Sequence, residues 1–272
     1  MKYCRFKFAG HTHYGAVEQR GREFWIAGLT EAPEEDLAFR IEHGSTSSFA
    51  HGFAPMPLSA AKLLPPVTPS KIVCVGRNYR EHARELGNEV PAEPMIFFKP
   101  PSSLLEPGGA VRLPKFAERV DFEGELVLVI GRRASKLPPT ADWREVVRGF
   151  TLANDISARD LQKKDGQWWR AKGCDTFGPV GPIVSDELNL DAGLTLETRL
   201  NGEIRQQASS RDFIFSVPEL LSAITAALTL EPGDIILTGT PSGVGPLTPG
   251  DRVEVSMAGL GVLSNTIQAA SA

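Results

Sequence analysis

Cysteine is scarce in this chain. Cys4, Cys74 and Cys174 are the three cysteines among 272 residues, and they are odd in number and far apart. A disulfide framework is therefore excluded as the basis of the fold. No apolar run reaches about 18 residues, so no membrane-spanning helix is expected. The opening residues MKYCRFKFAG also lack the apolar centre of a signal peptide. These absences predict a cytoplasmic protein.

A strong charge excess is also missing. The formal net charge is -4, which gives no reason to expect nucleic acid or an anionic membrane as a partner. Hydrophobic residues make up 42% of the chain and charged residues 23%, which is typical of a soluble globular protein. The length suits one large domain, or a main domain with a small companion.

A proline-rich stretch, LLPPVTPSK, divides the chain at Leu63 to Lys71. Prolines interrupt both helices and strand ladders, so this stretch is typical of a linker. Short strand-like runs precede it, and many more follow it. We therefore expect a small N-terminal β domain at residues 1–62 and a main domain at residues 71–272. With numerous strands, tight turns and few helices, the main domain is predicted to be a β-rich sandwich or roll of α+β class.

Three local patterns in the main domain are informative. Asn201-Gly202 lies between two strand-like runs and predicts a hairpin. Val217 to Leu228 has the apolar periodicity of a long amphipathic helix. Thr238 to Gly245, TGTPSGVG, is a glycine-rich loop after a short buried strand, but it lacks the lysine of a phosphate-binding loop. Nucleotide binding is therefore excluded as its function.

The stretch VDFEGELVLVIG, from Val120 to Gly131, predicts one long strand with an unusual face. Side chains alternate along a strand, so Glu123 and Glu125 share a face that continues with two valines. Two unpaired carboxylates about 7 Å apart on a half-buried face would repel each other and be poorly solvated. A hard cation such as Mg²⁺ or Mn²⁺ would neutralise them. Gly124 between them is expected to add flexibility.

Asp155 offers a third carboxylate. It follows the strand-like run GFTLAN, just before a helix-like segment that starts at Ser157. From that place it either reaches a shared cation or caps the helix. With Glu123 and Glu125 it would complete an all-oxygen ligand set, which suits Mg²⁺, Mn²⁺ or Ca²⁺ and disfavours zinc.

The segment RNYREHARELG predicts a short helix that starts with a capping box, Asn78 with Glu81. Within it His82 and Glu85 are three residues apart and share one helix face. They form either a surface ion pair or a general base oriented by a carboxylate.

Two lysines lie in turns near these elements. Lys172, in a turn rich in glycine and proline, is a candidate to pair with developing negative charge. Lys99, at the end of the strand MIFFK where a turn begins, either meets an anion or faces solvent. A substrate with adjacent carboxylate and keto oxygens would chelate the metal, which would polarise the carbonyl and stabilise an enolate. His82 would then take a proton from water.

Six motifs occur in an order that resembles the fumarylacetoacetate hydrolase family. They are GRNYREHARELG, IFFKPPSS, DFEGELVLVIG, FTLANDISARDLQ, AKGCDTFGP and ILTGTPSGVG, within residues 71–267. The chain looks most like bacterial members related to acylpyruvate hydrolases, oxaloacetate decarboxylases and 2-hydroxyhepta-2,4-diene-1,7-dioate isomerases. Cys174 departs from the larger apolar or hydroxyl residues of relatives. Residues 1–60 resemble the small extra β domain of some bacterial members.

The resemblance implies a mixed β-sandwich roll, a Mg²⁺ or Mn²⁺ site with Ca²⁺ as a possible substitute, and a homodimer. It also implies a helical lid that carries the His82–Glu85 pair. By motif position, the implied metal ligands are Glu123, Glu125 and Asp155, the catalytic residues are His82, Glu85 and Lys172, and the substrate-binding residues are Arg77, Lys99, Arg159, Gln162 and Thr240.

Three functions remain open at this point. The leading hypothesis is a metal-dependent hydrolase or decarboxylase that cleaves a C–C bond next to a carbonyl in a 2-oxo or 2,4-dioxo acid. The alternative is an isomerase of an unsaturated 2-oxo dioic acid in aromatic catabolism, which needs the same metal but no attacking water. The third is a metal-binding structural or regulatory protein that has kept the fold and lost the chemistry.

Overall fold

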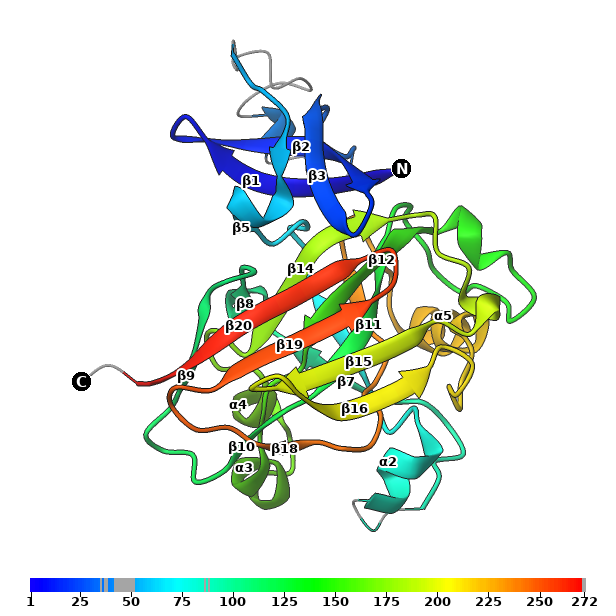
Figure 1. Ribbon diagram of the computed structural model, residues 1–272. Coiled ribbons are helices and arrows are strands. Elements are labelled where there is room, and N and C mark those ends of the chain that lie inside the picture. The colour runs from blue at the N-terminus through cyan, green and yellow to red at the C-terminus, as the bar shows by residue number, and fades with distance from the viewer. Residues whose placement is uncertain (35, 37–38, 42–51, 86, 88, 271–272) are drawn as a thin grey trace.

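The computed structural model describes residues 1–34, 36, 39–41, 52–85, 87 and 89–270. Strands dominate these residues, and the short helices lie at the margins of the sheets (Figure 1). The strands form one sheet of twelve strands, one of five and one of three. The β-rich α+β class predicted from the sequence is confirmed.

The N-terminal strands form a meander in the order β4-β3-β2-β1, with β5 on the other side of β1. Two residue pairs then join β1 antiparallel to β14 of the main sheet, Lys2 with Ser185 and Tyr3 with Val184. The division of the chain into domains at residues 62–71 stays a prediction. The bounds are β1 Lys2–Phe8, β2 His11–Arg20, β3 Glu23–Thr30, β4 Met56–Pro57 and β5 Lys62–Leu64.

The rest of the twelve-stranded sheet runs in the order β14-β12-β11-β17-β6-β7, and β8 lies parallel to β14. Only the β17–β6 pair on this path is parallel among the described strands. The bounds are β6 Ile72–Gly76, β7 Met95–Lys99, β8 Leu104–Leu105, β11 Gly124–Ile130, β12 Val147–Asn154, β14 Gly178–Ser185 and β17 Ile235–Leu237.

The five-stranded sheet has the order β16-β15-β19-β20-β9, and the three-stranded sheet has the order β13-β10-β18. Their bounds are β9 Ala110–Leu113, β10 Val120–Phe122, β13 Ser157–Ala158, β15 Thr195–Leu200, β16 Glu203–Ser209, β18 Gly245–Pro246, β19 Arg252–Met257 and β20 Gly261–Ala269. The described helices are α2 Arg80–Glu85, α3 Arg159–Lys164, α4 Trp169–Lys172, α5 Val217–Ala227, and the 3₁₀ turns η1 Leu58–Ala60, η2 Pro101–Ser103, η3 Trp143–Glu145 and η4 Leu190–Ala192.

Strand β11 lies at the centre of the core, and all seven of its residues are buried. Leu126 and Leu128 belong to the apolar cluster that also contains residues of β15, β19, β20 and α5. Val127 and Val129 point the other way, into a second cluster with residues of β17 and β6. Because both faces are covered, β11 reads as a nearly continuous apolar run after Glu125.

The prediction of one long strand from Val120 to Gly131 is wrong. The chain forms two strands, β10 and β11, which belong to different sheets, and Glu123 lies at their junction. Side chains hold the backbone there, since the amide of Glu123 donates to Asn154 Oδ1 at 2.8 Å and that of Gly124 donates to Gln206 Oε1 at 2.9 Å. Alternation holds beyond the junction, where Glu125 shares its face with two valines.

Other local predictions have mixed outcomes. The Asn201-Gly202 hairpin is confirmed by β15 and β16, and the long helix is confirmed by α5. The capping box of Asn78 is wrong. Its buried side chain instead donates to the carbonyl of Thr238 at 2.8 Å and accepts from the amide of Phe215 at 2.8 Å. Asn78 therefore ties the base of α2 to the protein body. None of the described helices is long and apolar enough to cross a membrane.

Gly124 has a packing role that the sequence did not reveal. A Cβ atom at this position would lie 2.0 Å from Thr198 Oγ1 on β15 and 3.2 Å from Val255 Cγ1 on β19. The absence of a side chain therefore lets the five-stranded sheet pack directly against the start of β11, where the two glutamates lie.

We expect Gly124→Ala to lower the free energy of unfolding by about 1–3 kcal/mol, because the added methyl group overpacks a buried contact. Thr198→Ala removes a hydroxyl that has no hydrogen-bond partner in the described structure, so the double variant should regain part of the loss. Urea unfolding of the four proteins measures this coupling. Equal effects of Gly124→Ala with and without Thr198 would contradict the packing explanation.

Candidate metal centre and active site

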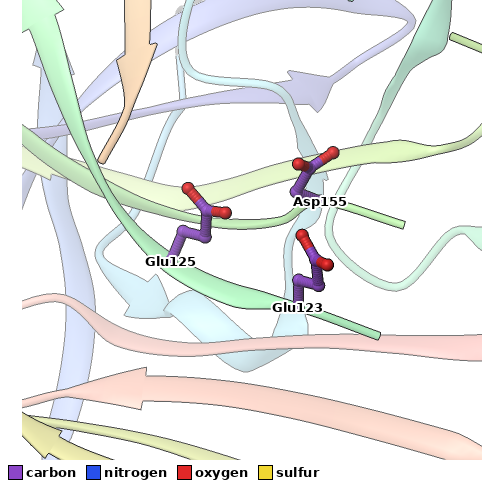
Figure 2. Close-up of side chains that lie close together, drawn as sticks. All are labelled: Glu123, Glu125 and Asp155. Carbon is purple, nitrogen blue, oxygen red and sulfur yellow. The ribbon is translucent and has the colours of Figure 1, made fainter. Parts of the chain in front are cut away.

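Three buried carboxylates converge at the junction of β10 and β11. One oxygen each from Glu123, Glu125 and Asp155 lies within 4.8 Å of the other two (Figure 2). The antiparallel pairing of β11 with β12 brings them together, since Gly124 pairs with Asn154. The next residue, Asp155, then donates its backbone N–H to the carbonyl of Glu123 at 2.8 Å. The helix-cap alternative for Asp155 is not observed, because Ala158 precedes α3 and the Asp155 side chain bonds lysines.

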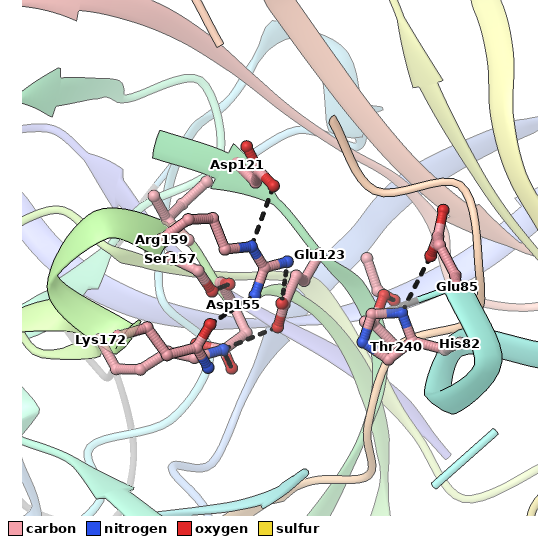
Figure 3. A network of polar contacts seen from close by, with 12 residues as sticks. His82, Glu85, Asp121, Glu123, Asp155, Ser157, Arg159, Lys172 and Thr240 are labelled. Atoms are coloured by element: carbon pink, nitrogen blue, oxygen red, sulfur yellow. Dashed lines mark hydrogen bonds and ion pairs between the residues drawn. The ribbon is translucent and has the colours of Figure 1, made fainter. Parts of the chain in front are cut away.

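Three buried cations contact two of these carboxylates. Lys172 Nζ bonds Glu123 Oε2 at 2.7 Å and Asp155 Oδ2 at 2.6 Å (Figure 3). Lys99 Nζ bonds Asp155 Oδ1 at 2.6 Å, and Arg159 Nη2 forms an ion pair with Glu123 Oε1 at 2.5 Å. Buried charges require such partners, so these cations offset the cost of burying Glu123 and Asp155.

The pKa shifts of Glu123, Lys172 and Glu125 follow from burial and from these contacts. Burial by itself would raise the pKa of Glu123, but the charges of Arg159 and Lys172 outweigh burial and hold this pKa well below its usual range. Burial favours the neutral form of Lys172, yet Asp155 and Glu123 raise its pKa above the ordinary value. The pKa of Glu125 is raised well above its usual range, by burial first and then by the charges of Asp155 and Glu123.

Glu125 is the one carboxylate of the cluster without an ion-pair partner among the described residues. It accepts the backbone N–H of Gly239 at 2.7 Å, and no described cation forms an ion pair with it. Each carboxylate oxygen has two lone pairs, so the lysine contacts of its neighbours leave room for a further ligand bond. Three clustered carboxylates and a raised Glu125 pKa fit a hard divalent cation such as Mg²⁺ or Mn²⁺. The residues present therefore fit the predicted metal.

His82 and Glu85 lie on α2 beside this cluster. His82 Nδ1 is 3.2 Å from Glu85 Oε2, and Glu85 Oε1 accepts the backbone N–H of Gly243 at 3.0 Å. Only 4% of the His82 surface is exposed, which does not fit the alternative of a surface ion pair. Glu85 lies on the side of the imidazole away from Asp155 (Figure 3). The second ring nitrogen, Nε2, therefore remains available for proton transfer.

A cavity of about 310 Å³ connects the carboxylates with His82. Two of the predicted residues do not line it. Glu85 lies behind His82, and Lys99 bonds Asp155 from a buried position. The predicted residues that line it are Arg77, His82, Glu123, Glu125, Asp155, Arg159, Gln162, Lys172 and Thr240.

Sequence reasoning missed several residues of the site. Phe97, Trp168 and Lys163 line the cavity, and the ring centroids of the two aromatic residues are 5.3 Å apart. Alternation along β7 offered a signal for Phe97, because it shares a strand face with Lys99. Asp121, which accepts from Arg159 Nε at 2.9 Å, had no signal, since its partner lies 38 residues away.

Residues 71–268 match the family described as Fumarylacetoacetate (FAA) hydrolase C-terminal. The chain belongs to the fumarylacetoacetate hydrolase family. Its fold agrees, since a crystal structure of 2-hydroxyhepta-2,4-diene-1,7-dioate isomerase from Mycobacterium marinum superposes with a TM-score of 0.83 at 36% identity, covering 100% of both chains. The mixed β-sandwich roll implied by the resemblance is thereby confirmed.

Two relatives in this fumarylacetoacetate hydrolase family carry the same functional name. The chain is 45% identical to oxaloacetate tautomerase FAHD1, mitochondrial, of Arabidopsis thaliana, over 70% of this chain and 87% of the relative. It is 42% identical to oxaloacetate tautomerase YisK of Bacillus subtilis, over 77% of this chain and 74% of the relative. An enzyme of this family is therefore supported, which disfavours the hypothesis of a purely structural protein.

We expect the purified protein to bind Mn²⁺ and Glu125→Gln to weaken this binding. The Mn²⁺ affinity should fall by more than about 10- to 100-fold, which is the typical effect of removing a residue that only supports a metal ligand. Isothermal titration calorimetry measures the affinity. Glu203→Gln, which removes an exposed carboxylate on β16, is the matched control and should bind like the wild type. Equal affinities of the two variants would exclude Glu125 as a ligand.

Proposed function

We propose that this chain is a divalent-metal enzyme that interconverts the enol and keto forms of a small, oxaloacetate-like 2-oxo acid. The observation that carries the proposal is one cavity lined both by three clustered carboxylates and by His82. A base next to a cation site is what enolisation of a 2-oxo acid requires. The two relatives named oxaloacetate tautomerase support this choice of reaction.

The size and charge of the cavity support a small anionic substrate. About 310 Å³ is at the lower end of the range of ligand sites, which suits a compact acid. Arg77 and Lys163 line the cavity, and neither has an ion-pair partner among the residues that the structure describes. Both cations are therefore available to substrate carboxylates, while Lys172, Arg159 and Lys99 are engaged with the carboxylate cluster.

When bound, the divalent cation would polarise the 2-oxo group and stabilise negative charge on its oxygen. Glu123, Glu125 and Asp155 are the residues that would hold it. Lys172 holds two of these ligands in place and also lines the cavity, so its charge lies near the oxygen that becomes negative.

The proton is moved by His82. In the ketonisation direction, the imidazole accepts the enol O–H proton at Nε2, the double bond shifts from C2–C3 to C2–O, and the imidazolium returns the proton to C3, so the only σ bond to carbon that forms is C–H. Glu85 accepts a hydrogen bond from Nδ1–H, which selects the tautomer whose Nε2 can take a proton, and its carboxylate stabilises the imidazolium that forms. Phe97 and Trp168 make part of the cavity wall apolar.

Cleavage of a C–C bond, which was the leading hypothesis from the sequence, is the second candidate. The same His82–Glu85 pair can accept a proton from a water molecule that attacks a carbonyl, which is the first step of hydrolysis. Decarboxylation would break the C3–C4 bond of the keto form, release CO₂ and leave the enolate of pyruvate, which then takes a proton at C3. Moving a double bond, the reaction in the name of the M. marinum isomerase, also requires proton transfer. A homodimer and a cytoplasmic location stay predictions.

One assay separates the two candidates. Enol oxaloacetate, added with Mg²⁺ or Mn²⁺, loses its ultraviolet absorbance as it ketonises, while pyruvate and CO₂ appear only if a C–C bond breaks. We expect faster loss of the enol than in a protein-free blank, without extra pyruvate. Release of pyruvate from oxaloacetate or from acylpyruvates at a matching rate would make cleavage the principal reaction, and conversion of a dienoate dioic acid would favour the isomerase.

We expect His82→Ala to lower kcat by about 10²–10⁴-fold, the usual contribution of a positioned general base. Mn²⁺ affinity should be retained, because His82 is not among the clustered ligands. Stopped-flow absorbance gives the rate, and calorimetry gives the affinity. His11→Ala, at an exposed histidine of β2, is the matched control. A His82→Ala protein that still turned over substrate at the wild-type rate would exclude the base assignment.

A further inference from the structure

The glycine-rich loop Thr238–Gly245, which follows β17, contacts both halves of the candidate site. The backbone N–H of Gly239 donates to Glu125 Oε2 at 2.7 Å, and that of Gly243 donates to Glu85 Oε1 at 3.0 Å. Glu125 belongs to the carboxylate cluster, whereas Glu85 belongs to helix α2, which lies earlier in the chain. Only three loop residues, 240–242, therefore separate the two backbone amides, which bond to functionally different carboxylates.

We propose that this loop is the positioning element that fixes the His82–Glu85 pair relative to the metal ligands, and that Gly243 is a positioning residue that acts through Glu85. The proposal rests on the proposed function for its catalytic consequence. It assigns a task to a loop whose glycines resemble those of nucleotide-binding loops but which has no phosphate-binding lysine.

The loop can hold a fixed position because it is bound to β11, the strand that carries Glu125. Thr238 Oγ1 donates to the carbonyl of Leu126 at 2.8 Å, and Thr240 Oγ1 donates to that of Gly124 at 2.9 Å. Gln206 of β16 completes the connection. It accepts the N–H of Gly124 at 2.9 Å and donates to Thr240 Oγ1 at 2.7 Å. All these bonds are buried, so the loop and β11 form one unit.

Gly243 can place its amide only because it has no side chain. Its φ of +101° lies in a region that favours glycine, and a Cβ atom would lie 1.8 Å from the carbonyl oxygen of Arg205 on β16. The clash is with backbone, which cannot turn aside as a side chain can. Any larger residue must therefore lift the loop from β16 and move the amide away from Glu85.

Glu85 in turn needs both of its contacts. Each of its two oxygens has a different partner, because Oε2 faces His82 Nδ1 and Oε1 accepts the backbone N–H of Gly243. The Glu85 side chain is 32% exposed, so without the Gly243 amide water would compete for the carboxylate. The imidazole would then lose the group that fixes its tautomer and orientation. A loss of this kind lowers kcat more than it raises KM.

The test compares Gly243→Ala with Gly250→Ala. Gly250 has nearly the same φ, +98°, but nothing lies within 4 Å of a Cβ atom there, so it controls for backbone strain alone. We expect Gly243→Ala to lower kcat about ten- to hundredfold, as for the loss of a hydrogen bond to a charged group, with KM and Mn²⁺ affinity retained. Gly250→Ala should leave kcat unchanged.

Hydrogen exchange of the α2 amides gives a readout that does not depend on activity. Exchange in residues 80–85 should become faster in Gly243→Ala and in Glu85→Ala, and stay unchanged in Gly250→Ala. Glu85→Ala leaves the loop intact, so it tests the contact even if Gly243→Ala folds poorly. Unchanged exchange in Glu85→Ala, or in a folded Gly243→Ala, would overturn the proposal.

A double-mutant cycle decides whether Gly243 acts through Glu85. If it does, Gly243→Ala should reduce kcat far less in the Glu85→Ala background than in the wild type. Fully additive losses would indicate a general structural effect and would overturn the positioning role. Inactivity of the wild type towards enol oxaloacetate would refute the proposed function alone, because the exchange experiment would still report on the loop.

Discussion

Burying three carboxylates within 4.8 Å of one another creates an electrostatic demand on which the rest of the site depends. Mutual repulsion and desolvation oppose the ionised forms, so the surroundings must supply positive charge or directed N–H groups. Lys172 and Lys99 supply charge to Asp155, whereas Glu125 receives a backbone amide. A divalent cation would meet the remaining demand. The acidic cluster and its cations are therefore one structural unit, and neither would be stable in the core without the other.

The same demand explains the irregular backbone around the site. A regular strand through Glu123 would bond only to neighbouring strands, yet here the side chains of Asn154 and Gln206 accept its amides. Breaking the strand moves β10 into a separate sheet and leaves Glu123 at a junction, where its carboxylate meets Asp155. Gly124 lets the second sheet pack against this junction. Function and fold share these few residues, so changes there should affect both.

Much of the site was predictable, but by different kinds of signal. Strand alternation placed Glu125 on one face with two valines, and helix spacing placed His82 beside Glu85. The convergence of these groups with Asp155 followed only from the family resemblance, because local spacing carries no information on contacts between distant segments. Alternation along the chain also predicted one strand where the structure has β10 and β11. The side chains that interrupt the strand come from residues 154 and 206, which local sequence cannot reveal.

By itself, the amino-acid sequence determined the β-rich class and predicted an all-oxygen set of candidate ligands. These properties depend on composition and on periodicity over a few residues, which are local. Tertiary structure alone decided which cation serves which carboxylate, that Lys99 supports Asp155 from a buried position, and that the glycine-rich loop holds both Glu85 and Glu125. Such contacts join residues that are far apart in the chain, and their energies depend on distances and burial that exist only after the sheets have packed.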